Sequence, residues 1–347
     1  MKAHGPISIS DIVVATALSR ATIDRVINKR RGVHPRTQAH VLRVIDRLES
    51  GDLSGKHEAS AFESRETPRL RMVIQAGLTF TRSLLGAVQQ ISQAGTSVAT
   101  LQAVASRSED ETAELIRTLG AESDGLAVVS KNTEPVKAAL TDLRTAGKPV
   151  VALVSDLDPH VRSAYVGIDN RAAGQVAGFI FGRCLERTPE ATVAVVVGYF
   201  SYRCQEDREI GFRSLLGQRF PHIKLVEVIK GQDSPEATHE AALRLLQKRP
   251  DIAGVYNVAG GNRGLAQALA ECQLPRRPLF IGHEVNEVTE PLLRAGVIDF
   301  LITQSIESLV RTTRQLLIDL KLAKGPVREL NHLPVRLVSE YNLKPID

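Results

Sequence analysis

The sequence predicts an α/β protein with a small all-helical head and a body of two doubly wound subdomains, each with a parallel sheet. The head is predicted because residues 1–50 read as three short helices. The body is predicted because apolar, β-branched segments alternate with amphipathic helical ones beyond residue 70, the pattern of βαβ units. About nine candidate strands are more than one sheet of this type usually holds, which favours two sheets.

The composition is that of an ordinary globular protein. The chain has 347 residues, of which 43% are hydrophobic and 24% charged, enough for several domains and a large core. It has no uninterrupted apolar run of about 18 residues, and its first residues, MKAHGPISISD, lack the features of a secretory signal. We therefore expect a cytoplasmic protein.

The cysteines and histidines indicate neither a disulfide framework nor a metal site. Cys184, Cys204 and Cys272 are far apart and odd in number, so we expect free, buried thiols. The nine histidines form no HExxH motif and no tight cluster. No cofactor is predicted.

The positive charge of the chain is concentrated at its N-terminus. Residues 1–56 contain ten lysines and arginines against five acidic residues, so their surplus accounts for the whole net charge of +5. A basic head on a neutral body suggests that the head meets a polyanion. The surplus is modest and does not by itself establish DNA binding.

Three helices are expected in the head, over residues 1–50. The first is capped by Ser8 or Ser10, and its apolar positions are Ile9, Ile12, Val13 and Thr16. The second is capped by Ser19 and ends at the run Lys29-Arg30-Arg31-Gly32. The third begins at Pro35 and carries Val41, Leu42, Val44, Ile45 and Leu48 at helical spacing. The few residues between the first two helices suit a helix-turn-helix.

A polar linker, residues 51–69, separates the head from the body, residues 70–347. The expected strands of the body are RMVIQAG, DGLAVVS, KPVVALVSD, SAYVGID, ATVAVVVGY, KLVEVIKG, AGVYNVAG, RPLFIGHE and VIDFLITQ. Ligands bind such sheets outside the carboxyl ends of the strands, so polar residues that follow strands are the candidate site.

The basic second helix of the head has two interpretations. Most helices with cationic ends are simply solvated. Alternatively, this one lies in a DNA groove, with Arg20, Ala21 and Arg25 reaching base edges and Ser19 and Thr22 at phosphates. The further candidate DNA contacts are Ser8, Asn28, Lys29, Arg30, Arg31 and Arg36, mainly as partners of the phosphates.

The head resembles the headpiece of the lactose-repressor (LacI/GalR) family of bacterial regulators. The stretch SISDIVVATALSRATIDRVINKRRGVHPRT matches that pattern at Ser8, Asp11, Ile12, Ser19, Thr22, Ile23, Arg25, Val26, Asn28, Val33 and Thr37. It departs from the pattern at Ala17, Asp24 and His34. Asp24 places an anion where the family has a phosphate-binding serine, which predicts an unusual operator preference or affinity.

The hinge motif of that family is not visible after Leu48. The sequence there reads ESGDLSGKHEAS, in which Leu53 is a weak candidate for an apolar wedge in the minor groove. The resemblance therefore implies major-groove reading by the head and leaves minor-groove kinking open.

The body is similar to the periplasmic-binding-protein-like (type I) sugar-sensing domain of such regulators. The segments YVGIDNRAAGQVAG, DREIGF, GVYNVAGGNRG, FIGHE and FLITQ occur in the order of that domain. The resemblance implies that the ligand contacts are Thr79, Phe80, Asp169, Asn170, Arg208, Asn257, Asn262, Glu284 and Gln304. Carboxylates, amides and an arginine fork suit a sugar or polyol. For each residue taken singly, a capping or interface role remains open.

Catalytic motifs are missing from the sequence. GGNRG and the glycines near Gly77 form no GxGxxG fingerprint, and the chain has neither a phosphate-binding loop nor a GxSxG elbow. We therefore do not expect an enzyme.

These observations predict a transcription regulator, expected by family habit to be a repressor, that binds an operator as a homodimer or a tetramer. Half-sites about 34–36 Å apart follow from dimer geometry, and a small sugar or polyol controls DNA binding. The main alternative is the solute-binding protein of a sugar transporter, against which the basic head counts. A sugar-modifying enzyme with a DNA-binding head is a second alternative that no motif supports.

Overall fold

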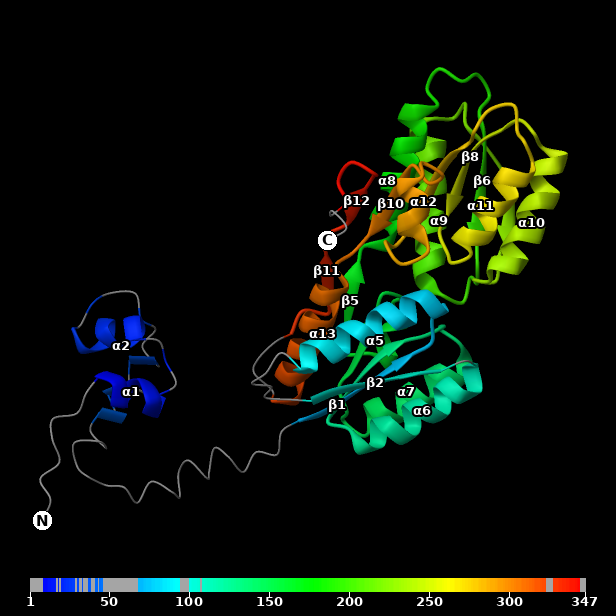
Figure 1. The fold of residues 1–347 in the computed structure, drawn as a ribbon. Coiled ribbons are helices and arrows are strands. Elements are labelled where there is room, and N and C mark those ends of the chain that lie inside the picture. Colours follow the sequence, from blue (N-terminus) through cyan, green and yellow to red (C-terminus); the bar gives the residue numbers. More distant parts are fainter. Residues whose placement is uncertain are drawn as a thin grey trace, which may run out of the picture. The chain divides into compact units, whose positions relative to one another are not determined.

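The computed structural model describes residues 9–16, 18, 20–28, 30, 33, 37–38, 41–42, 44–45, 68–93, 100–106, 108–322 and 327–343. The chain divides into two compact units, residues 1–66 and 67–347, drawn in Figure 1 and treated separately below. The predicted linker lies largely outside the described residues. The body begins at Arg69, one residue before the predicted boundary, because its N–H donates to Asp124 and its backbone joins the first strand.

The head contains the two helices that its apolar pattern predicts. They are α1 (Ile9–Thr16) and α2 (Arg20–Ile27), and α2 begins four residues after α1 ends. Their buried side chains Ile12, Ile23 and Val26 form one cluster with Val41. Residues 37–38, 41–42 and 44–45 are also helical, in the region of the predicted third helix.

The first subdomain of the body is a six-stranded parallel sheet in the order β11-β5-β4-β3-β1-β2. Its strands are β1 (Arg69–Ile74), β2 (Thr100–Ala105), β3 (Gly125–Val129), β4 (Val150–Leu153), β5 (Ala164–Ile168) and β11 (Leu330–Leu333). Its helices are α5 (Leu78–Gln93), α6 (Glu109–Glu122), α7 (Glu134–Thr145), α13 (Ile306–Lys321) and the short η1 (Pro159–Val161). The central strands β3, β4 and β5 are buried along their whole length because helices cover both faces.

The second subdomain repeats this topology with the sheet order β12-β10-β9-β8-β6-β7. Its strands are β6 (Thr192–Val197), β7 (Lys224–Lys230), β8 (Ile252–Asn257), β9 (Leu279–His283), β10 (Phe300–Thr303) and β12 (Arg336–Val338), of which only β12 is antiparallel to its neighbour. Its helices are α8 (Asn170–Cys184), α9 (Arg203–Arg219), α10 (Pro235–Lys248), α11 (Asn262–Glu271) and α12 (Thr289–Arg294).

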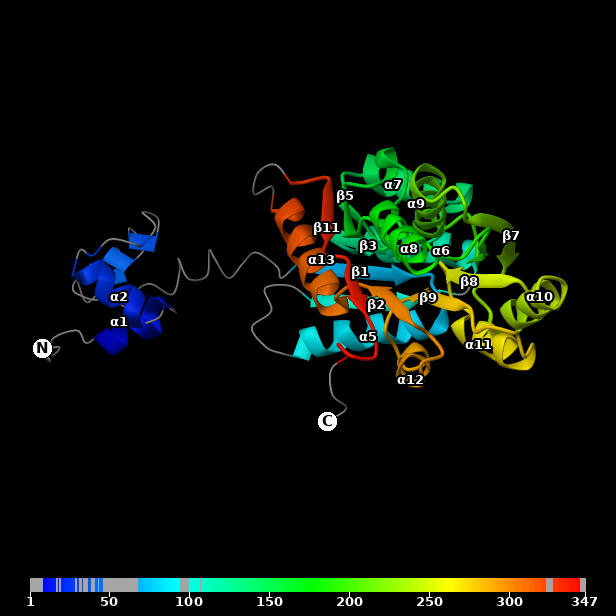
Figure 2. The ribbon, with the colours of Figure 1, turned by 90° about the horizontal axis from the view of Figure 1, so that it is seen from above.

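The chain passes between the two subdomains three times. It crosses after β5 into α8, after β10 into α13, and between β11 and β12. Helix α13 thereby returns to the first subdomain, where Figures 1 and 2 both show it beside α5. The prediction of two doubly wound subdomains with parallel sheets is confirmed.

Three strands were not predicted, and all three are edge strands. β2, β11 and β12 carry the alternating or polar sequences TLQAVA, LNHL and RLV, which lack the continuous apolar run of a central strand. In the part of the chain that the structure describes, no helix is long and apolar enough to cross a membrane.

Candidate functional site

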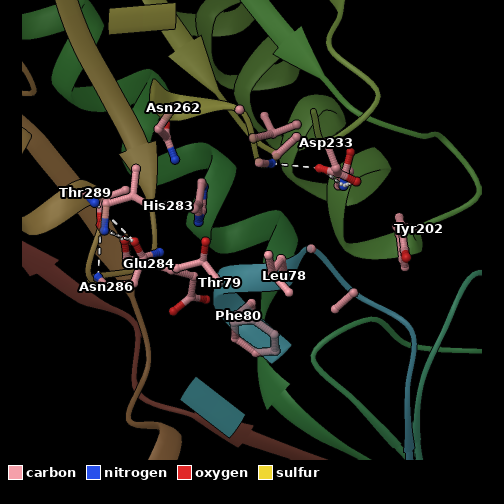
Figure 3. Close-up of a pocket in the computed structure, with 18 of the residues that line it drawn as sticks. Leu78, Thr79, Phe80, Tyr202, Asp233, Asn262, His283, Glu284, Asn286 and Thr289 are labelled. Atoms are coloured by element: carbon pink, nitrogen blue, oxygen red, sulfur yellow. Dashed lines mark hydrogen bonds between the residues drawn. The ribbon is translucent and has the colours of Figure 1, made fainter. Parts of the chain in front are cut away.

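A cavity of about 430 Å³ lies between the two subdomains, at the carboxyl ends of their parallel strands (Figure 3). The first subdomain contributes Ala76, Gly77, Leu78, Thr79, Phe80, Val129, Val154 and Ser155 to its wall. The second contributes Tyr202, Cys204, Gln205, Arg208, Asp233, Pro235, Glu236, Val258, Ala259, Gly260, Gly261, Asn262, Arg263, His283, Glu284, Asn286, Val288 and Thr289. Five predicted ligand contacts are therefore on the wall: Thr79, Phe80, Arg208, Asn262 and Glu284.

Arg208 is held rigidly at the bottom of this cavity by α8 and α9. Its side chain is buried, its Nε donates to Asn170 Oδ1 at 2.9 Å, and its Nη1 donates to the carbonyl oxygen of Val258 at 2.9 Å. The two helices approach so closely that a Cβ at Gly174 would overlap the carbonyl oxygen of Arg208. A glycine at this position therefore lets the guanidinium reach the strand ends.

Two predicted contacts, Asp169 and Asn170, are not on the wall. Asp169 caps α8, because its carboxylate accepts the N–H of Ala172 at 2.9 Å. Asn170 is buried behind Arg208, and its Nδ2 donates to the carbonyl oxygen of Val154 in the first subdomain at 2.9 Å. In this structure the two residues position α8 and the guanidinium, and their direct contact with a ligand stays a prediction.

Asn257 and Gln304 also stand behind the wall and hold residues that line it. Asn257 is fully buried, and its Nδ2 donates to Asn262 Oδ1 at 2.8 Å and to the carbonyl oxygen of Gly260. Gln304 Nε2 donates to Glu284 Oε1 at 3.1 Å. The amide of Asn257 is fully engaged with its neighbours, whereas Gln304 Oε1 is buried without a partner among the described residues. Ligand contact by these two residues stays a prediction.

Glu284 follows β9 in a strained backbone conformation. Its φ of 64° lies in the left-handed region, which is rare for a glutamate and is often found at functional sites. Its carboxyl group accepts from Thr303 Oγ1 at 2.9 Å as well as from Gln304. Burial raises the pKa of this carboxyl, while Arg208 and the two donors lower it again. Glu284 is thus a polar wall residue whose orientation is fixed.

His283 precedes Glu284 and is buried at the cavity wall, with 3% of its surface exposed. Its Nε2 lies 2.8 Å from the hydroxyl oxygen of Tyr256, and its Nδ1 has no partner among the described residues. Burial and the charge of Arg208 hold the pKa of the imidazole well below its ordinary value, so the ring is neutral. Figure 3 draws His283 on the wall with Asn262 and Glu284.

Asp233 forms the opposite end of the polar wall and was not predicted from the sequence. It follows β7 with φ of 52°, and its Oδ1 accepts the N–H of Gly260 at 2.7 Å. Gln205 Nε2 donates to both carboxylate oxygens, at 3.2 and 3.0 Å. The position of Asp233 after a strand was the available signal, although the sequence QDSPEAT reads more strongly as the start of a helix.

Direct contacts join the two subdomains around the cavity. The hydroxyl of Tyr202 donates to the carbonyl oxygen of Gln75 at 3.0 Å, and the N–H of Asn132 donates to the carbonyl oxygen of Ser201 at 2.8 Å. From α5, Arg82 Nη1 reaches Glu287 Oε1 at 2.6 Å. The structure is therefore one in which the cleft is closed.

In the head, Arg20, Ala21, Arg25, Asn28 and Arg30 are exposed on α2 and just beyond it, and Thr22 is half-buried. The other predicted DNA contacts, Ser8, Ser19, Lys29, Arg31 and Arg36, lie outside the described residues, or their side chains do.

The unusual Asp24 is paired inside the head. Its carboxylate accepts from Asn28 Nδ2 at 2.7 Å and from Arg30 Nη1 at 3.1 Å. Two of the predicted contacts are therefore engaged with Asp24, and this partly neutralises its charge.

The described residues include no group of three metal-binding side chains. All three cysteines are free thiols, as predicted, but only Cys204 is buried: Cys272 is half-buried and Cys184 is exposed. The expectation of burial is corrected for the last two, because Cys184 lies at the exposed end of α8 and Cys272 follows α11.

Residues 79–325 match the family described as periplasmic binding protein domain. The chain is also 31% identical over 181 residues to catabolite control protein A of Streptococcus mutans serotype c (strain ATCC 700610 / UA159). That alignment covers 51% of this chain and spans about half, 52%, of this curated relative.

Solved structures of sugar-binding proteins have the same fold. The glucose-galactose binding protein GanP of Geobacillus stearothermophilus superposes with a TM-score of 0.71 at 20% identity, over 80% of this chain and 99% of that chain. The periplasmic component of an ABC-type sugar transport system from Hahella chejuensis gives 0.71 at 22% identity, over 79% and 100%. A solute-binding protein of Agrobacterium vitis with bound D-fucose gives 0.70 at 15% identity, over 79% and 96%. At these identities the likeness concerns the fold.

Proposed function

Since the chain belongs to the periplasmic binding protein domain family, we propose that its cleft binds a sugar or polyol. The arrangement of the wall supports this. Fixed donors and acceptors from Arg208, Asn262, Glu284 and Asp233 surround a cavity large enough for a monosaccharide. The fold of GanP and of the fucose-bound protein agrees with this proposal.

We further propose that the whole chain is a cytoplasmic, DNA-binding transcription regulator of the LacI/GalR type and acts as a homodimeric repressor. The observation that carries this proposal is the basic head. There α2, packed on α1, exposes Arg20 in its first turn and Arg25 in its last turn, as a recognition helix in a major groove would. The partial match to catabolite control protein A supports the same assignment.

Ligand control follows if the sugar binds the closed cleft more tightly than an open one. The contacts of Tyr202 with Gln75 and of Arg82 with Glu287 form only when the subdomains meet. A ligand that bridges the subdomains favours this state, and a coupling of about 1–3 kcal/mol to DNA binding is typical of such regulators.

The second candidate function is that of a solute-binding protein of a sugar transporter. The structures from Hahella chejuensis and Agrobacterium vitis favour it, because their described functions are in transport and their fold covers 79% of this chain. Their likeness leaves about a fifth of this chain uncovered. Such a protein has no need of a basic helical head.

The experiment that separates the two functions is selection of DNA by the purified full-length chain from a random duplex library. We expect an enriched pseudo-palindromic sequence, whose binding is then measured by fluorescence anisotropy. Arg20→Ala should abolish the preference for this sequence over random DNA. Arg31→Ala, in the cationic run that the sequence assigns to phosphates, is the control and should weaken binding to both DNAs equally and lower the salt dependence. Failure to enrich any sequence would favour the transporter function.

A further inference from the structure

Arg208 is a buried cation without a carboxylate partner. Its guanidinium donates to two neutral acceptors, Asn170 Oδ1 and the carbonyl oxygen of Val258. Among the described residues no acidic oxygen lies within 4.0 Å of it, although the residue is only 5% exposed. Burial of an unpaired charge is costly, so a site of this kind favours a ligand that brings the opposite charge.

His283 lines the same cavity, and its Nδ1 is buried without a partner among the described residues. The buried hydroxyl of Tyr256 has one hydrogen-bond partner, His283 Nε2, so its proton remains unsatisfied unless the hydroxyl donates to that nitrogen. The single proton of the neutral imidazole then sits on Nδ1, which is buried and unpartnered on the cavity wall. Tyr256 thus sets the tautomer of His283.

Arg208 lies on α9, and the carbonyl group that holds it lies beside His283 at the ends of neighbouring strands. Tyr256 of β8 pairs with Ile281 of β9. In the same register, two residues further along, Val258 lies beside His283. The carbonyl oxygen of Val258 accepts from Arg208.

The carboxylate of Asp233 follows β7 and reaches back to the end of β8, where its Oδ1 accepts the N–H of Gly260 at 2.7 Å. Gln205 Nε2 donates to both oxygens of this carboxylate, so Asp233 is already hydrogen-bonded within the wall.

Glu284 directly follows His283 in the chain, and its carboxyl group already accepts two hydrogen bonds. Thr303 and Gln304 donate to its two oxygens, and burial raises the pKa of its carboxyl group. Glu284 consequently compensates the charge of Arg208 only in part.

We propose that the cleft takes a sugar acid, an aldonate or uronate, whose carboxylate is bound by the guanidinium of Arg208 and by the Nδ1 proton of His283. This rests on the proposed binding of a sugar or polyol in the cleft. The hydroxyl groups of the ligand then face the amide and carboxylate groups of Asn262 and Asp233. A monocarboxylate fits better than a phosphate, because Asp233, Glu236 and Glu284 on the same wall repel a dianion more strongly.

The test is isothermal titration calorimetry of the full-length chain with matched pairs: D-glucuronate against D-glucose, D-galacturonate against D-galactose, and D-gluconate against D-sorbitol. D-glucose 6-phosphate completes the panel. We expect at least one acid to bind about tenfold tighter than its neutral partner, the effect of one charge-assisted contact.

Equal or tighter binding of the neutral partners would overturn the sugar-acid proposal and leave the proposed function intact. Tighter binding of the phosphate than of every acid would also overturn it. If no compound of the panel binds, both the proposal and the sugar-binding function fail.

The role of His283 is tested with the variants Tyr256→Phe and His283→Leu. Both variants should lower the ratio of the affinity for the acid to the affinity for its neutral partner by about threefold or more. In Tyr256→Phe the hydroxyl that keeps the ring proton on Nδ1 is missing, and in His283→Leu the donor itself is missing. Nitrogen NMR of the histidine ring should show the proton on Nδ1 in the native chain and a mixture of tautomers in Tyr256→Phe. A native proton on Nε2, or an unchanged ratio in both folded variants, would overturn the assignment.

Discussion

The two subdomains have the same topology, yet they contribute unlike halves to the cavity. The first supplies a wall without a single titratable side chain, dominated by Ala76, Leu78, Phe80, Val129 and Val154. The second supplies every charged group, including Arg208, Asp233 and Glu284. The comparison indicates that the second subdomain recognises the ligand, whereas the first shapes and covers it.

The difference arises from side chains on equivalent backbones. β4 and β9 occupy the same place in the two sheets, and the residue after each strand has a left-handed conformation, with φ of 62° at Val154 and 64° at Glu284. Both residues line the cavity. One position thus carries an apolar group in the first subdomain and a carboxyl group in the second, which fits a division between cover and recognition.

The largest expected effect comes from the charged residues that the second subdomain contributes to the cavity. Arg208→Gln should weaken binding of the ligand that the chain prefers by about 100-fold, because the fork of charge-assisted hydrogen bonds is lost. Calorimetry measures the change. Arg213→Gln is the matched control, since Arg213 lies on the same helix and pairs with Glu209 outside the cavity. A loss below threefold for Arg208→Gln would break the comparison.

The next effect concerns the pH dependence of stability, which we attribute to His283 in the second subdomain. The pKa of His283 in the folded chain lies well below its ordinary 6.5, so only the unfolded chain takes up a proton as the pH falls below 6.5. The free energy of unfolding should therefore decrease below pH 6.5 by up to about 1.4 kcal/mol per pH unit from this group.

Urea unfolding of the native chain and of His283→Gln at pH 7.5, 6.5 and 5.5 measures this contribution. The variant should lose less stability than the native chain between pH 6.5 and 5.5. His160→Gln, at an exposed position in the first subdomain, should not change the profile. Parallel curves for His283→Gln and the native chain would mean that the buried imidazole does titrate.

The apolar wall residues of the first subdomain should affect the affinity for all ligands without changing the preference between acidic and neutral ones. Phe80→Ala removes part of the cover and should weaken every bound sugar or polyol by about tenfold, from the loss of buried apolar surface. The ratio between acidic and neutral ligands should stay constant in calorimetry. Phe179→Ala, an exposed position on α8, is the control. A changed ratio would show that the first subdomain takes part in recognition.

The smallest effect is expected at the ion pair that joins the two halves. Arg82 and Glu287 are more than half exposed, at 57% and 55%, so their pair contributes at most about 1 kcal/mol to closure. Arg82→Gln and Glu287→Gln should each weaken ligand binding no more than about threefold, and the double variant should be no weaker than either single one. Additive losses would exclude a specific pair across the cleft.

The fold could be predicted because it depends on long-range repetition of simple patterns. Continuous apolar segments indicate the central strands of both sheets, and amphipathic segments indicate the helices between them. The short edge strand β12 has neither pattern. The return of α13 and β11 to the first subdomain and of β12 to the second depends on which hydrophobic core each segment packs against. Local sequence patterns do not reveal this.

The sequence predicts the region of the candidate site, because polar residues follow the ends of strands, but it does not predict which of these residues line the cavity. Five of the nine predicted side chains line the cavity, and three others, Asn170, Asn257 and Gln304, hydrogen-bond to residues on its wall. Sequence position does not distinguish a wall residue from the one behind it, because both follow a strand and both are polar. Asp233 was missed since its loop resembles an ordinary helix start.

The central claim is that the ligand of the cleft controls DNA binding by the head. The direct measurement is the anisotropy of a labelled duplex of the selected sequence, titrated with the native chain and with Arg208→Gln, with and without a ligand shown by calorimetry to bind. We expect the ligand to change the DNA affinity of the native chain by at least about fivefold and to leave that of the variant unchanged. Equal DNA affinities of the native chain with and without saturating ligand would contradict the account.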